Sequence, residues 1–161
     1  MNTQEQFERL FDNEMTKAEA RAFLISLYEK GESAEDIAAA AYVMRKHSVK
    51  LPLSHELREK AIDVVGTGGD KSGSFNISST VSLLLASMGS TVAKHGNRSI
   101  TSNSGSADLL EALGINLDLT PDNQVKMLEE TGFCFIYAMN HHPAMKHIMP
   151  IRKSIDHRTI F

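Results

Sequence analysis

The first 60 residues carry apolar positions at the spacing of helices. Between residues 22 and 28, apolar side chains recur at the three- and four-residue intervals of one helix face. Thr16 and Glu19 precede this run as a capping box, in which hydroxyl and carboxylate each satisfy an unpaired amide. Gly31 ends the run, and Ser33 with Asp36 opens the next one. The pattern predicts a small helical domain over residues 1–60.

The period of the pattern changes at residue 61. Residues 61–65, Ala-Ile-Asp-Val-Val, are β-branched and run directly into glycines, which is typical of a buried parallel strand. Further strands are predicted at 91–93, 115–119 and 133–137, and helices at 78–87, 107–113 and 121–131. Alternating strands and helices indicate a parallel sheet with helices on its faces. We therefore expect an α/β domain over residues 61–161.

Composition narrows the classes of function. The formal net charge is −3, which argues against a nucleic-acid partner, and no apolar run reaches the length of a membrane span. The single cysteine, Cys134, lies in an apolar run and is expected to be buried and inert. Together these features favour the cytoplasm.

A glycine-rich loop follows the first predicted strand, over residues 66–76. Four glycines allow the backbone amides to approach an anion, and the next helix adds its N-terminus. A plain tight turn would explain a lone glycine pair, but not glycines combined with hydroxyls, Asn76 and Asp70. Neither a Walker A motif nor a dinucleotide fingerprint fits this loop. Asp70 would repel phosphate, so we expect it to face a sugar hydroxyl or a cation.

A second polar loop, residues 94–106, also lies between a strand and a helix. Lys94 supplies a charge for phosphate, Gly96 permits close approach, and Ser106 opens the next helix. Because carboxyl ends of parallel strands share one edge of a sheet, both loops are expected at that edge. Two such loops predict a ligand with pyrophosphate. His141, His142 and His147 are spaced poorly for a metal site, which we do not predict.

Five segments, in this order and spacing, resemble the anthranilate phosphoribosyltransferase family. They are GTGGD at 66–70, FNIS at 75–78, KHGNRS at 94–99, SGSADLLEALG at 104–114 and NHHPAMK at 140–146. The resemblance covers nearly the whole chain and implies a small helical domain followed by part of a mainly parallel α/β/α domain of the nucleoside phosphorylase and phosphoribosyltransferase type. It also implies a homodimer formed through the N-terminal helices.

The resemblance implies a reaction. The amine of anthranilate attacks the anomeric carbon of phosphoribosyl pyrophosphate and displaces pyrophosphate, with Mg²⁺ as cofactor, in tryptophan biosynthesis. Positioning and electrostatic stabilisation would carry most of the catalysis, and an aromatic amine needs no dedicated base. No residue is therefore assigned as an acid or base.

The resemblance also implies which residues bind the substrates. Contacts to phosphoribosyl pyrophosphate are expected from Gly66, Gly69, Asp70, Ser74, Asn76, Ile77, Ser78, Ser79, Lys94, His95, Gly96, Asn97 and Ser106. Ser78 would also be a magnesium ligand. Contacts to anthranilate are expected from Gly66, Asn97, His142 and Arg152, because a guanidinium can pair a carboxylate through two hydrogen bonds.

Two alternatives stay open. The chain matches only the first half of the family's length, before the acidic pair that holds magnesium, so it would be a truncated, non-catalytic phosphate-binding half. The other alternative is phosphorolysis of a nucleoside, as in the related pyrimidine nucleoside phosphorylases. Half of such a domain is also expected to leave an open sheet edge and an uncovered apolar face, which favour self-association.

Overall fold

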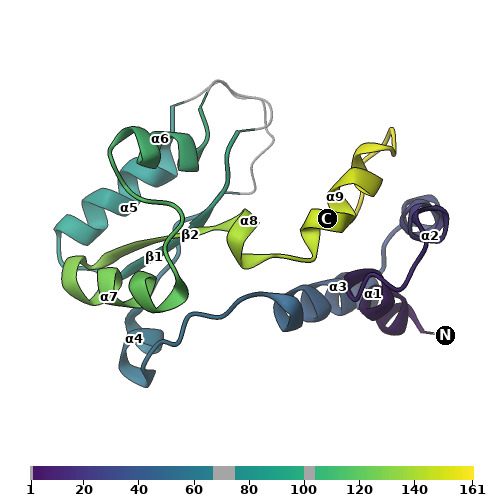
Figure 1. Ribbon diagram of the computed structural model, residues 1–161, viewed down its shortest axis with the longest axis horizontal. Coiled ribbons are helices and arrows are strands. Elements are labelled where there is room, and N and C mark those ends of the chain that lie inside the picture. Colours follow the sequence, from purple (N-terminus) through teal and green to yellow (C-terminus); the bar gives the residue numbers. More distant parts are fainter. Residues whose placement is uncertain (1, 67–74, 100–103) are drawn as a thin grey trace. The chain divides into compact units, whose positions relative to one another are not determined.

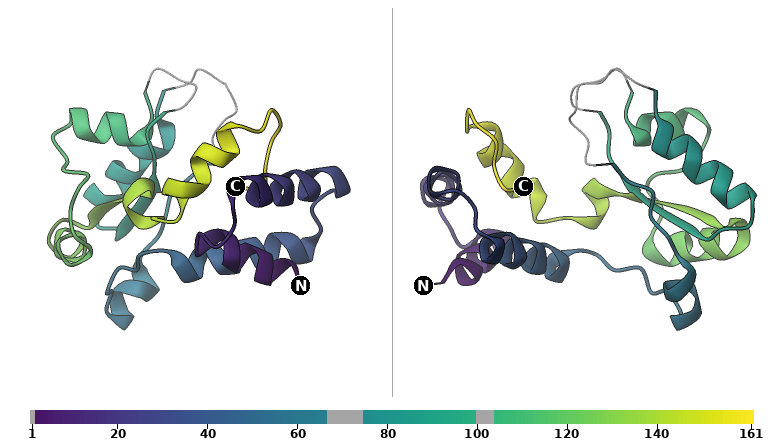
Figure 2. Two further views of the ribbon diagram at one scale, coloured as in Figure 1. Left: turned by 45° about the vertical axis from the view of Figure 1, so that its right-hand side comes forward. Right: turned by 180° about the vertical axis from the view of Figure 1, so that it is seen from behind.

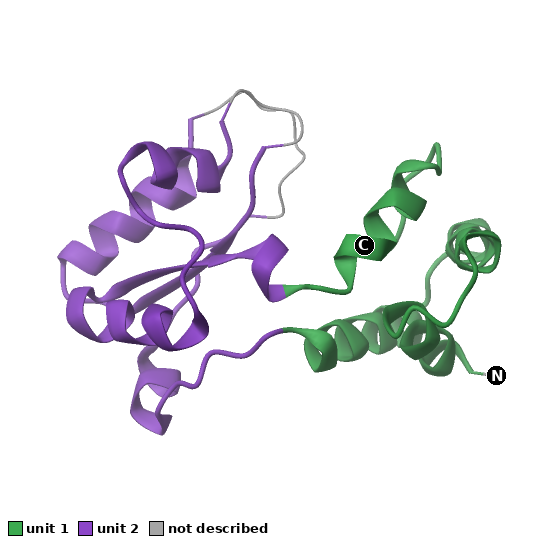
Figure 3. Ribbon diagram, viewed as in Figure 1, with its two compact units in different colours: residues 1–48, 142–161 green, residues 49–141 purple. Residues whose placement is uncertain are grey.

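A computed structural model describes residues 2–66, 75–99 and 104–161. The chain forms two compact units, coloured separately in Figure 3. The helical unit consists of Met1–Ser48 and His142–Phe161, and the α/β unit consists of Val49–His141. In this division by compactness, residues 142–161 group with the N-terminal helices.

The helical unit contains α1 (Thr3–Phe11), α2 (Lys17–Lys30), α3 (Ala34–His47) and α9 (Met145–Lys153). Capping boxes begin α1, α2 and α3, so the predicted pairs Thr16 with Glu19 and Ser33 with Asp36 are confirmed. Their carboxylates accept hydrogen bonds from the cap amides, as local spacing requires. None of the described helices is both long and apolar enough to cross a membrane.

One continuous core joins α9 to the first three helices. Ile148 and Ile151 of α9 lie in the same buried cluster as Phe7 and Phe23. The ring of Phe161 packs edge-on against Phe7 and against Phe11, with centroids 5.6 and 5.3 Å apart. These contacts between the two ends of the chain have no local sequence signal.

The α/β unit contains two parallel strands and five helices among its described residues. In chain order the elements are α4 (His55–Lys60), α5 (Ile77–Ser87), β1 (Val92–Gly96), α6 (Ser106–Ala112), α7 (Pro121–Thr131), β2 (Phe133–Tyr137) and α8 (Ala138–His141). β1 pairs with β2 in register from Val92↔Phe133 to Gly96↔Tyr137. The predicted α/β class with a parallel sheet is confirmed, as are the predicted helix and strand over residues 121–137.

Three predicted strands differ from the structure. Residues 61–65 form only an isolated parallel bridge, between Ile62 and Val92. Residues 115–119 form no strand, and the Asp118 amide instead donates to Asn116 Oδ1 in a turn. The strand predicted at 91–93 extends to Gly96, because β2 supplies a partner along its whole length. Lys94, His95 and Gly96 therefore belong to β1 and not to the loop.

Helices cover both faces of the two strands, with α5 and α6 on one side and α7 on the other (Figures 1 and 2). On the first side, Leu110 of α6 clusters with Val92 and Phe133. On the other side, Leu128 of α7 packs with Cys134. Burial raises the pKa of the Cys134 thiol to about 12, so the prediction of a buried, inert cysteine is confirmed.

Candidate functional site

The candidate site begins where the extended segments of the α/β unit reach their carboxyl ends. Lys94 is 1% exposed, and its Nζ donates to the Val64 carbonyl oxygen at 2.8 Å. Burial lowers the pKa of this ammonium group, and the negative charge of Asp63 opposes that shift. The His95 amide donates to Asp63 Oδ1 at 3.1 Å. Lys94 thus holds the segment that leads into the glycine-rich loop. Its contact, Val64, lies two residues before Gly66.

Hydrogen bonds to one carbonyl oxygen close the second loop where its two ends meet. We call these two ends, residues 96–99 and 104–108, the neck. Asn97 O accepts from Ser106 Oγ at 3.1 Å and from the Ala107 amide at 3.2 Å. A Cβ at Gly96 would lie 2.2 Å from Ser106 Oγ and 2.8 Å from the ring of Phe135. No side chain larger than hydrogen fits at Gly96 without moving its neighbours, which accounts for glycine there.

Gly105, on the other side of the neck, lies equally close to its neighbours. A Cβ there would lie 2.3 Å from the Ser99 amide nitrogen. Asp108 Oδ2 accepts from the amides of Gly105 and Ser99, at 2.8 and 3.2 Å. These two hydrogen bonds, with the Arg98 guanidinium, hold the pKa of Asp108 below its ordinary value. One ionised carboxylate therefore bridges both sides of the neck.

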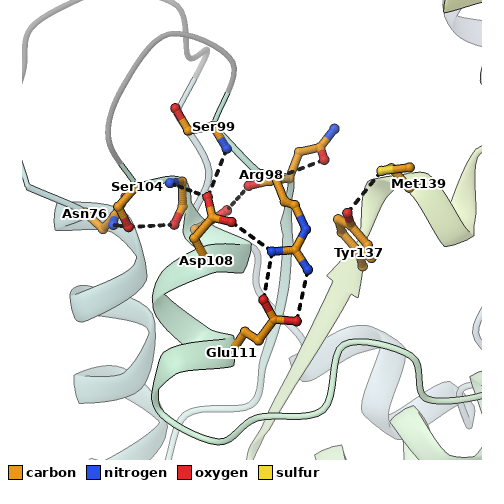
Figure 4. A network of polar contacts seen from close by, with 11 residues as sticks. Asn76, Arg98, Ser99, Ser104, Asp108, Glu111, Tyr137 and Met139 are labelled. Carbon is orange, nitrogen blue, oxygen red and sulfur yellow. Dashed lines mark hydrogen bonds and ion pairs between the residues drawn. The ribbon is translucent and has the colours of Figure 1, made fainter.

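Arg98 anchors the neck to α6 (Figure 4). Its guanidinium forms two hydrogen bonds with Glu111, at 2.8 and 2.9 Å, and one with Asp108 at 2.9 Å. Its Cζ also lies 5.8 Å from the centroid of the Tyr137 ring on β2. Paired carboxylates lower the positive charge that Arg98 presents, so it positions the loop more than it attracts an anion.

The first turn of α5 faces the second loop across one hydrogen bond, from Asn76 Nδ2 to Ser104 Oγ at 3.2 Å. The amides of Ser78 and Ser79 in this turn have no acceptor among the described residues. Ser79 is fully buried, and its Oγ has no hydrogen-bond partner in the described part of the chain. Free amides at a helix start attract anions, so this turn suits a phosphate group.

The structure groups most of the predicted phosphate-binding residues in the α/β unit. Around the neck and the first turn of α5 lie Asn76, Ile77, Ser78, Ser79, Lys94, His95, Gly96, Asn97 and Ser106. Gly66 is exposed, with open space where a Cβ would lie. Gly69, Asp70 and Ser74 lie outside the described residues. His142 and Arg152 belong to the helical unit, so the geometry of the α/β unit does not include them.

Ser78 is the magnesium ligand expected from the resemblance, and its half-buried hydroxyl lies in the first turn of α5. One hydroxyl is a weak magnesium site by itself, so phosphate oxygens of a ligand would have to complete it. Among the described residues, the only close group of three His, Cys, Asp or Glu ligands is Glu8, Asp12 and His47, in the helical unit. His141 and His147 instead hydrogen-bond to protein oxygens.

Sequence reasoning missed the residues that hold the neck. Arg98, Asp108 and Glu111 were not assigned a role, although Asp108 and Glu111 stand three residues apart on one helix face. Two acids at that spacing after a loop arginine could have predicted the ion pairs. Asp63 had no such signal, because its partner is a backbone amide 32 residues away.

Two family models match the chain in order. Residues 2–48 match the model described as "Glycosyl transferase family, helical bundle domain", and residues 58–161 match "Glycosyl transferase family, a/b domain". The anthranilate phosphoribosyltransferase of Chromobacterium violaceum is 50% identical over 153 residues, which are 95% of this chain and 44% of that protein. The resemblance found in the loop motifs therefore extends along nearly the whole chain.

Solved structures agree with these matches. The crystal structure of anthranilate phosphoribosyltransferase from Thermus thermophilus is similar with a TM-score of 0.87 and 42% identity, over 98% of this chain and 47% of that one. The structure of the Saccharomyces cerevisiae protein in complex with PRPP and Mg is similar with a TM-score of 0.79 and 31% identity, over 96% and 45% of the two chains. The chain spans about half the length of these proteins, and it belongs to the glycosyl transferase family.

Proposed function

We propose that this chain serves the transfer of the phosphoribosyl group of phosphoribosyl pyrophosphate to the amine of anthranilate. The closed neck carries this proposal, because Asn76 joins it to the first turn of α5, where the amides of Ser78 and Ser79 have no acceptor in the described part of the chain. The relatives named anthranilate phosphoribosyltransferase support the choice of substrates. The product would be phosphoribosyl anthranilate, a precursor of tryptophan.

In this reaction the anthranilate nitrogen forms a bond to the anomeric carbon while the bond from that carbon to pyrophosphate breaks. The attacking amine then loses one proton. Negative charge grows on the leaving pyrophosphate, so groups that are already oriented toward it lower the barrier. The amides of Ser78 and Ser79 and the side chain of Asn76 are such groups, and α5 holds them without further ordering.

Lys94 receives a different role from the one expected. Its ammonium group is buried against the Val64 carbonyl oxygen, so it would act on phosphate through the position of the glycine-rich loop. Asn97 is exposed at the neck, and its Oδ1 accepts from the Arg98 amide at 2.8 Å, so its side-chain nitrogen would meet either substrate. His142 and Arg152, from the helical unit, remain our proposed contacts for the anthranilate carboxylate. Arg152 is half-buried, and its Nη1 lies 3.8 Å from Met149 Sδ.

Magnesium is the proposed cofactor. The Saccharomyces cerevisiae structure in complex with PRPP and Mg supports its use in the family. Ser78 would help to hold the ion, which would supply positive charge to the leaving group. The position of the Ser78 hydroxyl is set by the first turn of α5, to which its backbone belongs.

A homodimer through the N-terminal helices remains part of the proposal. Tyr28 on α2 is 49% exposed, and Ile37 and Tyr42 on α3 are 54% and 57% exposed. Large apolar side chains in this number on two helices are typical of a surface that a partner covers. We also propose a cytoplasmic location, which suits the buried, unpaired thiol of Cys134.

The first test is calorimetric titration of this chain with phosphoribosyl pyrophosphate, with and without magnesium. Ser78→Ala should weaken magnesium-dependent binding about tenfold or more, because a hydrogen bond to a charged group is lost. Ser87→Ala is the matched control, since it removes the same hydroxyl at the other end of α5. Equal effects of both variants, or no binding by folded protein, would refute the proposed site.

The second candidate is a non-catalytic phosphate-binding half. It is favoured by the fraction of the Chromobacterium violaceum relative that the chain covers, 44%. Binding of phosphoribosyl pyrophosphate without any anthranilate-dependent formation of pyrophosphate would support this candidate. Pyrophosphate released in proportion to anthranilate consumed would exclude it.

A further inference from the structure

A buried histidine joins the two ends of the α/β unit. His141, 4% exposed, is the last residue of this unit, and Val49 is the first. The Val49 amide donates to His141 O at 2.9 Å, and His141 Nδ1 lies 3.1 Å from Val49 O. The other ring nitrogen, Nε2, lies 2.9 Å from Gln124 Oε1 on α7. We call Val49, Gln124 and His141 the His141 clasp.

The orientation of the Gln124 amide is determined by its second contact. Gln124 is 1% exposed, and its Nε2 donates to the Phe135 carbonyl oxygen at 2.9 Å. A flipped amide would place Oε1 against that carbonyl, and two acceptors would face each other in the core. Oε1 therefore points toward His141, where it accepts a hydrogen bond.

Both ring nitrogens of His141 thus face oxygen atoms that only accept. A neutral imidazole carries one donor and one acceptor, so one of its nitrogens would direct a lone pair at an oxygen. An imidazolium donates on both sides and satisfies Val49 O and Gln124 Oε1 together. In a buried place the difference in free energy between making and missing this hydrogen bond is large, because water cannot replace the missing bond there.

We propose that His141 is a positioning residue that holds the entry and the exit of the α/β unit together as a doubly donating imidazolium. Loss of its second proton removes one of the two bonds and opens the clasp.

Other titratable and charged groups act on His141 or adjoin the clasp. His95 on β1 repels a charge on His141, and the negative charge of Asp63 acts on His95 in turn. Lys50 and His142 adjoin the clasp in the sequence, and Asp118 is engaged by Asn140 Nδ2 at 3.0 Å. None of the described carboxylates pairs with His141, so two neutral oxygens alone retain its proton.

Side-chain nitrogen NMR of the folded chain tests the proposal directly. While the Val49 amide remains protected from exchange, both ring nitrogens of His141 should carry a proton. His147 is the internal comparison, because its Nε2 meets the single oxygen of Leu10 at 2.9 Å. One protonated and one bare nitrogen on His141, with the Val49 amide still protected, would overturn the proposal.

A variant separates a clasp from mere burial. Gln124→Met removes the acceptor at Nε2 and keeps an apolar filling, so one ring nitrogen of His141 should be bare in the folded variant. Opening should also make the Val49 amide exchange about fivefold faster. His147→Asn, in the helical unit, should change neither the protons on His141 nor this exchange rate. Two protonated ring nitrogens on His141 in folded Gln124→Met would reject the clasp, whether or not the chain binds substrate.

Discussion

The helical unit and the α/β unit differ in how completely they bury their apolar side chains. In the helical unit, Phe7, Leu24 and Leu27 are 0%, 1% and 2% exposed, and the C-terminal Phe161 closes over the ring of Phe7. In the α/β unit, α5 leaves a row of large apolar side chains at the surface. These are Ile77, Val81, Leu84 and Met88, which are 53%, 37%, 57% and 72% exposed.

The difference has a geometric cause. The three α5 residues and the C-cap Met88 are spaced four, three and four positions apart, which places them on one face of the helix. We call this face the α5 stripe. An apolar stripe of this length is a surface on which further protein packs. The helical unit also exposes large apolar side chains, Tyr28, Ile37 and Tyr42, but they are divided between two helices. The unit with the proposed site carries its exposed apolar side chains in one continuous row, so this unit should open more easily.

The largest expected effect comes from truncating the same side chain in each unit. Phe7→Ala leaves a cavity among rings and should lower the free energy of unfolding by about 3–5 kcal/mol. Phe75→Ala removes a ring that is 76% exposed in the α/β unit, so stability should change by about 0.5 kcal/mol or less. Urea unfolding followed by circular dichroism measures both. Comparable losses would show that the two units bury their rings alike.

A smaller loss is expected when the neck of the second loop is crowded. The new Cβ of Gly96→Ala would push Ser106 and Phe135 away from residue 96. The free energy of unfolding should fall by about 1–3 kcal/mol, and affinity for phosphoribosyl pyrophosphate should fall with it. Gly66→Ala is the matched control for stability, because open space surrounds its position. Thermal unfolding measures the change in stability, and calorimetric titration measures the change in affinity. If Gly96→Ala is as stable as Gly66→Ala, the neck is looser than its contacts indicate.

The two units also differ in how much of them the sequence predicts. The starts of α2 and α3 depend on residues three positions apart, such as Thr16 and Glu19, so local pattern is sufficient. The length of β1 depends on β2, about 40 residues later, and residues 61–65 lack a partner for more than one bridge. Strand pairing at such separation leaves no local trace, and two of the three errors were therefore strands assigned where only a bridge or a turn exists.

For the candidate site, the motifs predicted which residues gather but not what several of them do. Lys94 was expected to meet phosphate, yet its ammonium group lies against the Val64 carbonyl oxygen. That contact requires Val64 and Lys94 to sit on neighbouring extended segments, which only the fold supplies. Asp108 likewise gains its function from two amides, of Ser99 and Gly105, that the neck brings together.

Acid should weaken the helical unit through Asp36. The Lys30 ammonium, followed by the Ser33 amide, holds the pKa of this buried carboxyl well below its ordinary value. A depressed pKa contributes stability that is present above about pH 4, the unfolded value, and is lost as the pH falls through the folded value. The urea midpoint should therefore fall between pH 4 and pH 2.

Asp36→Asn should lower the midpoint at pH 7 and flatten its fall in acid, since the amide cannot titrate. Glu29→Gln, at an exposed position on α2, is the control and should leave the acid dependence of the original chain intact. If Asp36→Asn keeps the full acid dependence, the loss of stability comes from other carboxyl groups.

The smallest effect on stability, and the sharpest test of the comparison, concerns the α5 stripe. Leu84→Lys places a charge on a surface that is already in water, so stability should change by about 0.5 kcal/mol or less. Self-association of the chain should fall, because the charge cannot enter an apolar contact. Ser87→Lys adds the same charge to an exposed position of α5 outside the stripe and should leave association unchanged. Sedimentation velocity at several concentrations separates the two variants. If both variants dissociate the chain equally, net charge and not the stripe controls association; if Leu84→Lys unfolds the α/β unit, the stripe is buried and the two units are equally closed.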